Sequence, residues 1–442
     1  MSANPRRWWA LVVLAMAQFM VIMDTSIIGV ALPDMQRELG FTPEGLQWVF
    51  NAYVVAFGGL LLLGGRLSDL FGARKIFSTG WLILIAGSVV AAAATTAWVE
   101  VLGRGIQGVG GALIAPAAMT LLMMLFGHNP RELGKAMSLY GAAAPAGGTA
   151  GVFLGGVITE YLSWPWVFIV YIPIGVITLL AVPALLPATR RGSGSVDLLG
   201  GLSATAGITL VVYAIVAESW IAALGGAALL ALFLLVQRTA KSPIMPLGIW
   251  RTPGLAPANL AMALLGAAWI PMWYFLNLYL QQTLHLGQFA SGAALLPMTV
   301  AIMIFMVGIT AKLLARLGAK PLIAGGLLVL AAGVAWLSLA GPGGSFAADV
   351  LPASLVAAVG MSLAYIPAMM SAMSGVRPEE AGLASGIVNT TYNVGSALGL
   401  AVMTALAAGG TSPFVGAAVV ALGGAVLAGV TLTGKKQAAE IL

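Results

Sequence analysis

The sequence predicts an all-α polytopic membrane protein, and three observations support this fold class. Of the 442 residues, 60% are apolar and only 8% are charged, whereas soluble domains carry about 25% charged residues. The apolar residues form fourteen runs that are each long enough to cross a bilayer, for which about 20 residues are needed. Lys and Arg residues are concentrated in alternate loops between these runs, as expected for a chain that crosses a membrane repeatedly.

Each apolar run is predicted to be a helix, because a helix satisfies its own backbone hydrogen bonds inside lipid. The first run follows Arg6 and Arg7 but is too long for the apolar part of a signal peptide, so we expect it to be retained. The expected spans are 8–32, 44–64, 74–96, 98–121, 133–156, 162–186, 198–217, 219–237, 254–279, 289–311, 320–340, 348–373, 382–407 and 412–433.

The distribution of positive charge predicts the topology. If the N-terminus is cytoplasmic, 18 of the 20 Lys and Arg residues lie on the cytoplasmic side, and only Arg37 and Arg104 do not. This asymmetry is typical of membrane proteins, and an even number of helices places both termini in the cytoplasm. We expect the location to be the bacterial cytoplasmic (inner) membrane. Because the positive residues are spread over short loops, the net charge of +6 does not indicate nucleic-acid binding.

An internal repeat predicts how the helices are grouped. Gly72-Ala73-Arg74-Lys75 follows the second run, and the similar Gly318-Ala319-Lys320-Pro321 follows the tenth run, 246 residues later. The same shift brings the first six runs close to the last six. We therefore expect an N-terminal six-helix bundle at 1–190, two inserted helices with a linker at 191–252, and a C-terminal six-helix bundle at 253–442. Repeated halves of this kind place a substrate site at their interface near the bilayer midplane.

Ionisable residues inside the predicted spans are few, and each is a functional candidate because a charge at the bilayer centre costs about 2.5–3.5 kcal/mol on insertion scales. Asp24 in the first span and Arg104 in the fourth are expected at similar depth. Either Asp24 takes up and releases a proton beside Arg104, or the two form a static ion pair; the sequence does not establish contact. Glu100, next to Trp98 at the outer end of the fourth span, is expected to be solvated.

The segment Gly65–Lys75 is predicted to be a tight cytoplasmic loop that contains one carboxylate and three cations. Asp69 is expected at the membrane edge, where it would meet a helix N-terminus or an arginine of the other half. Such a contact would form in one conformational state and break in another. Alternatively, the loop only sets the topology through its cations. The residues assigned to conformational gating are Gly65, Asp69, Gly72, Arg74 and Lys75.

Polar and aromatic residues within the spans are candidates for a substrate cavity. Aromatic faces suit flat or cationic ligands, and the 20 methionines suit adaptable contacts. For each of these residues, interhelical packing or an interfacial aromatic belt is an equally good explanation. The candidates are Gln18, Asn51, Tyr53, Gln107, Trp269, Trp273, Tyr274, Asn277, Asn389, Tyr392 and Asn393.

The fifth span carries glycines at the spacing that allows two helices to approach closely. Gly147, Gly151 and Gly155 lie four residues apart, and Gly156 follows directly. They predict either ordinary helix packing or a tight seam that excludes protons.

The sequence does not indicate an enzyme. It has no cysteine and no His, Cys or carboxylate cluster with the spacing of metal ligands. It also lacks the Gly-Lys-Ser/Thr of a nucleotide-binding loop, so this chain is not expected to hydrolyse ATP. We expect no metal and no cofactor.

Four segments resemble motifs of the major facilitator superfamily. Gly65–Lys75 fits the signature Gly-x-Leu-x-Asp-x-x-Gly-x-Arg-Lys between helices two and three of that family. The segments Asp24–Pro33, Arg104–Ala112 and Gly147–Gly156 resemble the first-, fourth- and fifth-helix motifs of its fourteen-helix drug:proton antiporters. Two positions depart from these motifs, because Gly29 stands where Asn is usual and Val152 stands where Pro is usual. The resemblance covers essentially the whole chain.

The resemblance implies the fold, alternating access and proton coupling, with Arg104 tied to that coupling. The expected activity is the export of lipophilic, often cationic small molecules in exchange for protons, as in multidrug efflux. A proton-coupled transporter of one native metabolite or lipid is an alternative, and so is a membrane sensor or scaffold that transports nothing. The expected partners are these substrates, protons and membrane lipids, and the expected state is a monomer.

Overall fold

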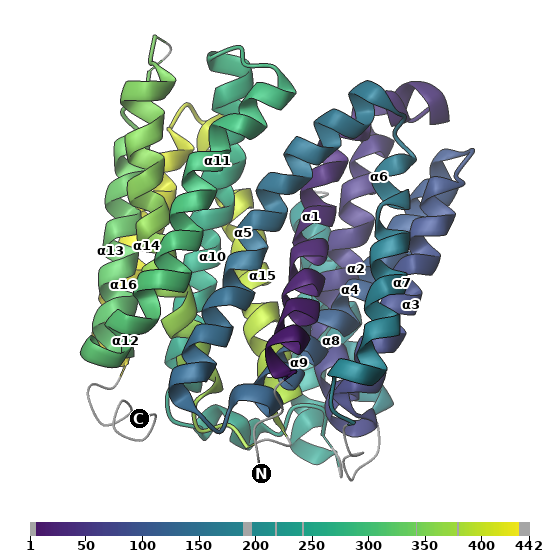
Figure 1. Ribbon diagram of the computed structural model, residues 1–442, viewed down its shortest axis with the longest axis vertical. Helices are drawn as coiled ribbons and strands as arrows, with labels where there is room; N and C mark the ends of the chain where they lie inside the picture. Colours follow the sequence, from purple (N-terminus) through teal and green to yellow (C-terminus); the bar gives the residue numbers. More distant parts are fainter. Residues whose placement is uncertain are drawn as a thin grey trace. The chain divides into compact units, whose positions relative to one another are not determined.

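The computed structural model describes residues 6–188, 197–216, 219–240, 243–341, 343–377 and 380–432. Within these residues all regular secondary structure is helical (Figure 1). The chain forms two compact units. Unit 1 comprises Met1–His128, Ala150–Ile249 and Val376–Thr390, and unit 2 comprises Asn129–Thr149, Trp250–Gly375 and Thr391–Leu442. The long helices α5 (Pro130–Tyr161) and α15 (Ala381–Ala408) each contribute to both units.

Unit 1 also contains the helices of the first half of the chain and those of the middle segment. They are α1 (Arg7–Leu39), α2 (Pro43–Phe71), α3 (Ala73–Ala92), α4 (Ala97–Phe126), the short α6 (Trp166–Ile169), α7 (Tyr171–Leu185), α8 (Leu198–Val216) and α9 (Trp220–Thr239). A 3-10 turn, η1 (Leu247–Arg251), follows α9 and leads into the second half of the chain.

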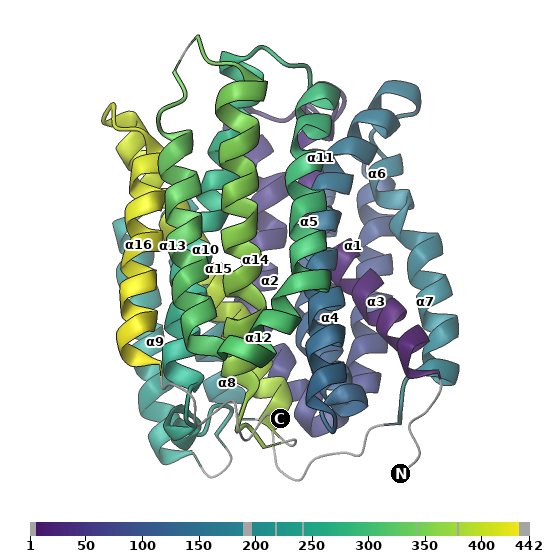
Figure 2. The same ribbon diagram turned by 60° about the vertical axis from the view of Figure 1, so that its left-hand side comes forward.

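Unit 2 contains the remaining helices, and three π-helical turns adjoin them. The elements are α10 (Leu255–Leu278) with η2 (Tyr279–Thr283), α11 (Gln288–Ile304), η3 (Phe305–Thr310), α12 (Ala311–Leu317), α13 (Ala319–Leu337), η4 (Phe346–Val350), α14 (Leu351–Met373) and α16 (Pro413–Thr431). Figure 2 shows α13 and α14 side by side within this unit.

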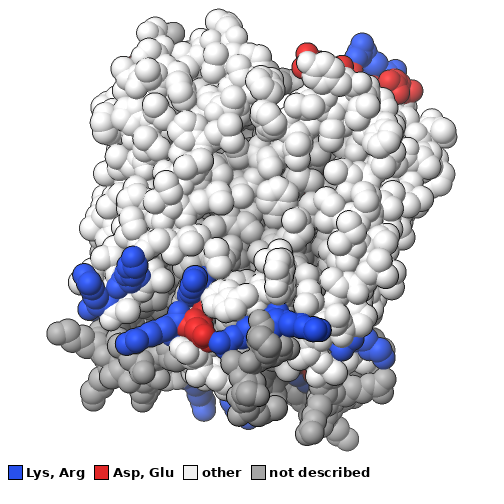
Figure 3. Space-filling model, viewed as in Figure 1, with Lys and Arg blue, Asp and Glu red and all other residues white. Residues whose placement is uncertain are grey.

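Twelve helical segments among the described residues are long and apolar enough to cross a membrane. They correspond to twelve of the fourteen expected spans. The expected spans 198–217 and 382–407 are the helices α8 and α15. The described apolar part of α8, Leu199–Val211, is shorter than the other segments, and α15 carries polar side chains such as Asn389 and Asn393. The face drawn in Figure 3 has a broad uncharged middle, with Lys and Arg side chains gathered at its lower edge.

Several helices differ in extent from the expected spans. The first was expected to end at residue 32, but α1 continues to Leu39 with Pro33 inside it. The fourth extends to Phe126 instead of residue 121. The sixth is divided into α6 and α7. Apolar runs mark the part of a helix that lies in lipid, and these helices continue beyond it.

The prediction of a loop at Gly65–Lys75 is also wrong for most of the segment. Helix α2 continues to Phe71 and α3 begins at Ala73, so that Gly72 alone connects them. Gly72 has a φ of 93°, a conformation that favours glycine. The same arrangement recurs 246 residues later, where Gly318 with a φ of 81° connects α12 to α13.

The internal repeat is also visible in helix packing. A Cβ added to Gly80 of α3 would lie 2.8 Å from the carbonyl oxygen of Gly110 in α4. At the position 246 residues later, a Cβ on Gly326 of α13 would lie 2.7 Å from the backbone nitrogen of Ala364 in α14. Both distances are too short for any residue larger than glycine, so each helix pair packs with its backbones in close contact.

This packing predicts that Gly326→Ala destabilises the protein and that its neighbour Gly325→Ala does not. The new methyl group at 326 would overlap the backbone of α14 and cost about 1–3 kcal/mol. At Gly325 nothing lies within 4 Å of the added Cβ, and alanine is the better helix former. The measurement is the apparent melting temperature of each purified variant in detergent. Equal melting temperatures for the two variants would contradict the packing.

Candidate functional site

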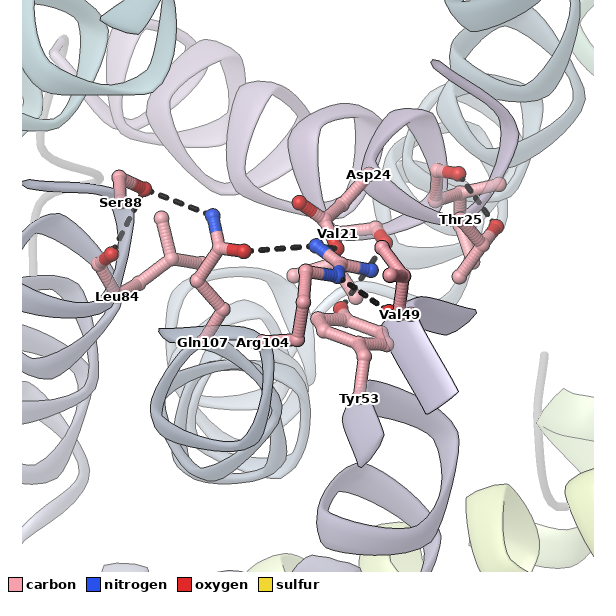
Figure 4. A network of polar contacts seen from close by, with 10 residues as sticks. Val21, Asp24, Thr25, Val49, Tyr53, Leu84, Ser88, Arg104 and Gln107 are labelled. Carbon is pink, nitrogen blue, oxygen red and sulfur yellow. Dashed lines mark hydrogen bonds and ion pairs between the residues drawn. The ribbon is translucent and has the colours of Figure 1, made fainter. Parts of the chain in front are cut away.

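A network of buried polar side chains joins α1, α2, α3 and α4 within unit 1 (Figure 4). At its centre, Arg104 of α4 and Asp24 of α1 form an ion pair, with Nη1 of Arg104 2.6 Å from Oδ2 of Asp24. Both side chains have no exposed surface. The structure therefore answers the question of contact that the sequence left open. A charge-assisted hydrogen bond of this kind is stronger than one between neutral groups.

The guanidinium group of Arg104 is held from several sides. Its Nε donates a hydrogen bond to the backbone carbonyl oxygen of Val49 at 2.9 Å, and its Nη1 donates to Oε1 of Gln107 at 2.7 Å. Its Cζ lies 4.7 Å from the ring centre of Tyr53 and 5.9 Å from that of Phe168. Aromatic faces at these distances attract a cation, so the position of the charge is fixed by four helices and not by Asp24 alone.

The network continues through two residues that the sequence assigned to the substrate cavity. Nε2 of Gln107 donates to Oγ of Ser88 at 2.8 Å, and Ser88 donates to the carbonyl oxygen of Leu84 at 2.8 Å. The hydroxyl group of Tyr53 donates to the carbonyl oxygen of Val21 at 3.2 Å. Tyr53 and Gln107 thus both contact Arg104 of the ion pair in this structure. A contact of either residue with substrate stays a prediction.

Some polar atoms around the ion pair have no hydrogen-bond partner among the residues that the structure describes. They are Oδ1 of Asp24, Nη2 of Arg104, the hydroxyl group of Tyr171 and both carboxylate oxygens of Glu100. Glu100 has no exposed surface, so the expectation that it is solvated is wrong. Glu100 lies one helical turn before Arg104, and residues four apart share a helix face. This spacing was the signal in the sequence that pointed to a buried position.

A second polar contact lies at the end of α2, also within unit 1. The carboxylate group of Asp69 accepts hydrogen bonds from the backbone N–H groups of Gly382 and Leu383, each at 2.8 Å. These two N–H groups belong to the first turn of α15, where a helix leaves its N–H groups unpaired and favours a negative charge. A helix N-terminus was one of the two partners expected for Asp69, and the structure shows that contact.

The other residues assigned to gating surround this contact. A Cβ on Gly65 would lie 2.4 Å from the carbonyl oxygen of Gly382, so α2 and α15 meet backbone to backbone there. Gly72 forms the one-residue connection to α3. Arg74, partly buried, and Lys75, exposed, lie in the first turn of α3. Gating itself stays a prediction for all five residues.

The remaining cavity candidates lie in both units. Gln18 and Asn51 are buried in unit 1. Asn389, also in unit 1, donates a hydrogen bond to the carbonyl oxygen of Ser385. In unit 2, Trp269 is buried, Trp273 is partly buried and Tyr274 is exposed. Asn277 accepts a hydrogen bond from Gln281, Tyr392 packs edge-on against Tyr365 with ring centres 5.8 Å apart, and Asn393 is partly buried. Substrate contact stays a prediction for each of them.

One glycine of α5, Gly151, packs closely against α1. A Cβ on Gly151 would lie 2.8 Å from the carbonyl oxygen of Met23 and 2.8 Å from Cβ of Ser26, both in α1. This close approach is next to Asp24 in the chain. Gly147, Gly155 and Gly156 are buried as well.

Comparison with known proteins extends these observations. The family described as "Major Facilitator Superfamily" matches residues 14–400. The chain is 38% identical to the cephamycin export protein CmcT of Amycolatopsis lactamdurans over 416 residues, which cover 91% of this chain and 85% of that protein. It is 38% identical to the puromycin resistance protein pur8 of Streptomyces alboniger over 423 residues, which cover 93% and 84% of the two chains.

A solved structure supports the fold. The human organic anion transporter MFSD10 superposes with a TM-score of 0.72 at 15% identity, covering 96% of this chain and all of that one. Together with the twelve apolar helices, these findings identify an integral membrane protein, and its bacterial relatives imply the cytoplasmic membrane. The family consists of transporters, so neither an enzyme nor a sensor or scaffold that transports nothing fits the chain. This protein belongs to the Major Facilitator Superfamily.

Proposed function

We propose that this transporter exports lipophilic, often cationic small molecules in exchange for protons, by alternating access. The observation that carries the proposal is the ion pair of Asp24 and Arg104, which has no exposed surface. Burial disfavours a charged carboxylate, whereas the guanidinium favours it. The balance between these two effects changes whenever the surroundings of the pair change, which is the property that proton coupling needs.

The relatives support the export of small molecules. The names of CmcT and pur8 describe the export of cephamycin and resistance to puromycin, respectively. The two alignments cover 91% and 93% of this chain, and the family match over residues 14–400 includes both residues of the ion pair. A shared scaffold does not by itself fix the substrate, so the class of compound rests on these names and on the aromatic residues of the spans.

In the proposed cycle, protonation of Asp24 releases Arg104 from its partner. The α1–α4 contact would then weaken, because a neutral acid attracts the guanidinium less than a carboxylate does. In this structure neither side chain of the pair has exposed surface, so proton exchange with water requires the helices around the pair to move. A static pair would stay closed throughout transport, and this difference makes the proposal testable.

The contact of Asp69 with α15 is proposed to stabilise the conformation described here. It joins residues more than 300 positions apart in the chain. A carboxylate that accepts two backbone N–H groups at a helix N-terminus contributes about 0.3–2 kcal/mol. This amount is large enough to shift a balance between two conformations and small enough to be broken in each cycle.

The topology expected from the sequence completes the proposal. We propose fourteen membrane helices, with α8 and α15 added to the twelve, and both termini in the cytoplasm. The two inserted helices are α8 and α9, between two six-helix bundles. A monomer is expected to transport, with protons and membrane lipids as its other partners.

The first prediction of this proposal concerns Asp24→Asn. The amide cannot release a proton in the cycle, so uptake driven by a proton gradient should fall at least about tenfold. The measurement uses inverted proteoliposomes with an imposed pH gradient and tetraphenylphosphonium as the transported cation. Asp34→Asn, on the same helix but paired at the surface with Arg37, is the matched control and should keep its activity.

Three outcomes would count against parts of the proposal. Undiminished gradient-driven uptake by Asp24→Asn would exclude Asp24 as the proton site. Transport of a single polar metabolite or lipid, with no movement of the cation, would favour the alternative of one native substrate. Equal transport with and without the proton gradient would exclude proton coupling.

The second prediction concerns the contact between α2 and α15. Asp69→Asn removes the negative charge from the N-terminus of α15, and Gly65→Ala places a methyl group against the carbonyl oxygen of Gly382. Both should lower the maximal transport rate several-fold while changing the apparent substrate affinity less than twofold. Gly58→Ala, on the same helix with nothing within 4 Å of the added Cβ, should behave as wild type. A change in affinity without a change in rate would contradict gating.

A further inference from the structure

We propose that Glu100 is a second proton-binding group, which shares Arg104 with Asp24 so that the site always holds one proton. Its part in transport rests on the proposed proton-coupled function, whereas its protonation does not. The proposal begins with geometry. Glu100 is fully buried, and neither of its carboxylate oxygens has a hydrogen-bond partner among the described residues.

The charged groups that act on Glu100 are Arg104, one turn further along α4, and Asp24 on α1. The nearby tyrosines, Tyr53 on α2 and Tyr171 on α7, interact with the same ion pair and are neutral hydroxyl groups. The site therefore contains two carboxyl groups and one permanent positive charge. If both carboxyl groups were ionised, one negative charge would be left without a partner inside the protein.

An uncompensated charge in such a place is strongly unfavourable, and a group that cannot find a partner takes up or loses a proton instead. Two carboxyl groups that share one site do not both ionise. In this structure Arg104 forms its ion pair with Asp24, through a hydrogen bond from Nη1. The proton is therefore on Glu100, which accounts for an acid that is buried without an ion-pair partner of its own.

A polar atom without a hydrogen-bond partner indicates how the proton can move from one carboxyl group to the other. Nη2 of Arg104 has no hydrogen-bond partner among the residues described, and it belongs to the same guanidinium group that now binds Asp24. When Asp24 takes up a proton, Nη2 is available for the carboxylate of Glu100. The proton that Glu100 gives up is the one that Asp24 takes up, so the site keeps one proton and remains neutral in both arrangements.

The position of Glu100 assigns it a side of the membrane. It lies in the first turn of α4, which is the outer end of this helix in the proposed topology. Asp24 and Arg104 lie deeper in the same unit. Glu100 is thus the carboxyl group through which the site would exchange protons with the outer aqueous phase.

The first test measures protonation directly. Infrared spectra of the purified protein at neutral pH should contain the C=O stretching band of a protonated carboxylic acid. The band should be absent from Glu100→Gln and present in Glu160→Gln, a matched control because Glu160 is an exposed glutamate at the end of α5. The same band in all three proteins would overturn the proposal, and so would its absence from the wild type.

The second test measures transport of tetraphenylphosphonium in proteoliposomes. For Glu100→Gln we expect gradient-driven uptake to fall about tenfold, while an apparent melting temperature in detergent close to that of wild type shows that the variant is folded. The remaining uptake should require lower pH, because loss of the second negative charge makes protonation of Asp24 less favourable. A pH profile identical to that of wild type would overturn the role in transport.

The two tests separate this inference from the proposed function. If the wild type shows no uptake driven by the proton gradient, the proposed function fails, and the infrared measurement still decides whether Glu100 binds the proton. If the wild type is gradient-driven and Glu100→Gln matches it in rate and pH profile, only the inference about Glu100 fails.

Discussion

The buried charge of Arg104 is the constraint on which unit 1 depends. A guanidinium group does not lose its proton in a protein, so the helices around it must supply partners for its charge. Asp24, Val49 and Gln107 provide oxygen atoms, and Tyr53 and Phe168 provide aromatic faces. Removing one member of such a buried pair typically costs about 3–5 kcal/mol, because the other charge is left unpaired. The ion pair is therefore needed for the stability of unit 1, and a change in its charge would strongly affect the packing of the helices around it.

Backbone contact between helices makes this arrangement rigid. Glycines at equivalent positions of the two halves, such as Gly80 and Gly326, allow helices to approach without side chains between them. Gly151 does the same for α5 and α1, beside Asp24. Because lipid offers no hydrophobic force to press helices together, this contact contributes much of the packing. A rigid frame also means that a change at the ion pair must displace whole helices and not single side chains.

The sequence predicted the fold class and the family well, because apolar runs, alternating loop charge and the motifs around Asp24, Asp69 and Arg104 depend on local composition. It predicted a partner for Asp69 of the right kind, a helix N-terminus, but placed that residue in a loop instead of in α2. It misjudged Glu100, since the end of a span looks interfacial when the helices packed around it are unknown. The alternation of apolar residues gives no information on which neighbours cover a particular turn. The helices α8 and α15, which we propose also cross the membrane, show the converse limit, because a short or polar helix does not meet a hydropathy criterion.

Gly72 has a mechanical consequence. Because only one residue connects α2 to α3, a rotation of one helix about its axis must be followed by the other. Asp69 stands three residues before this joint, and Gly318 provides the matching joint between α12 and α13. Each pair of helices would then move together as one rigid body, with the glycine as its connection. Inserted residues at either glycine would allow the two helices of that pair to rotate independently of each other.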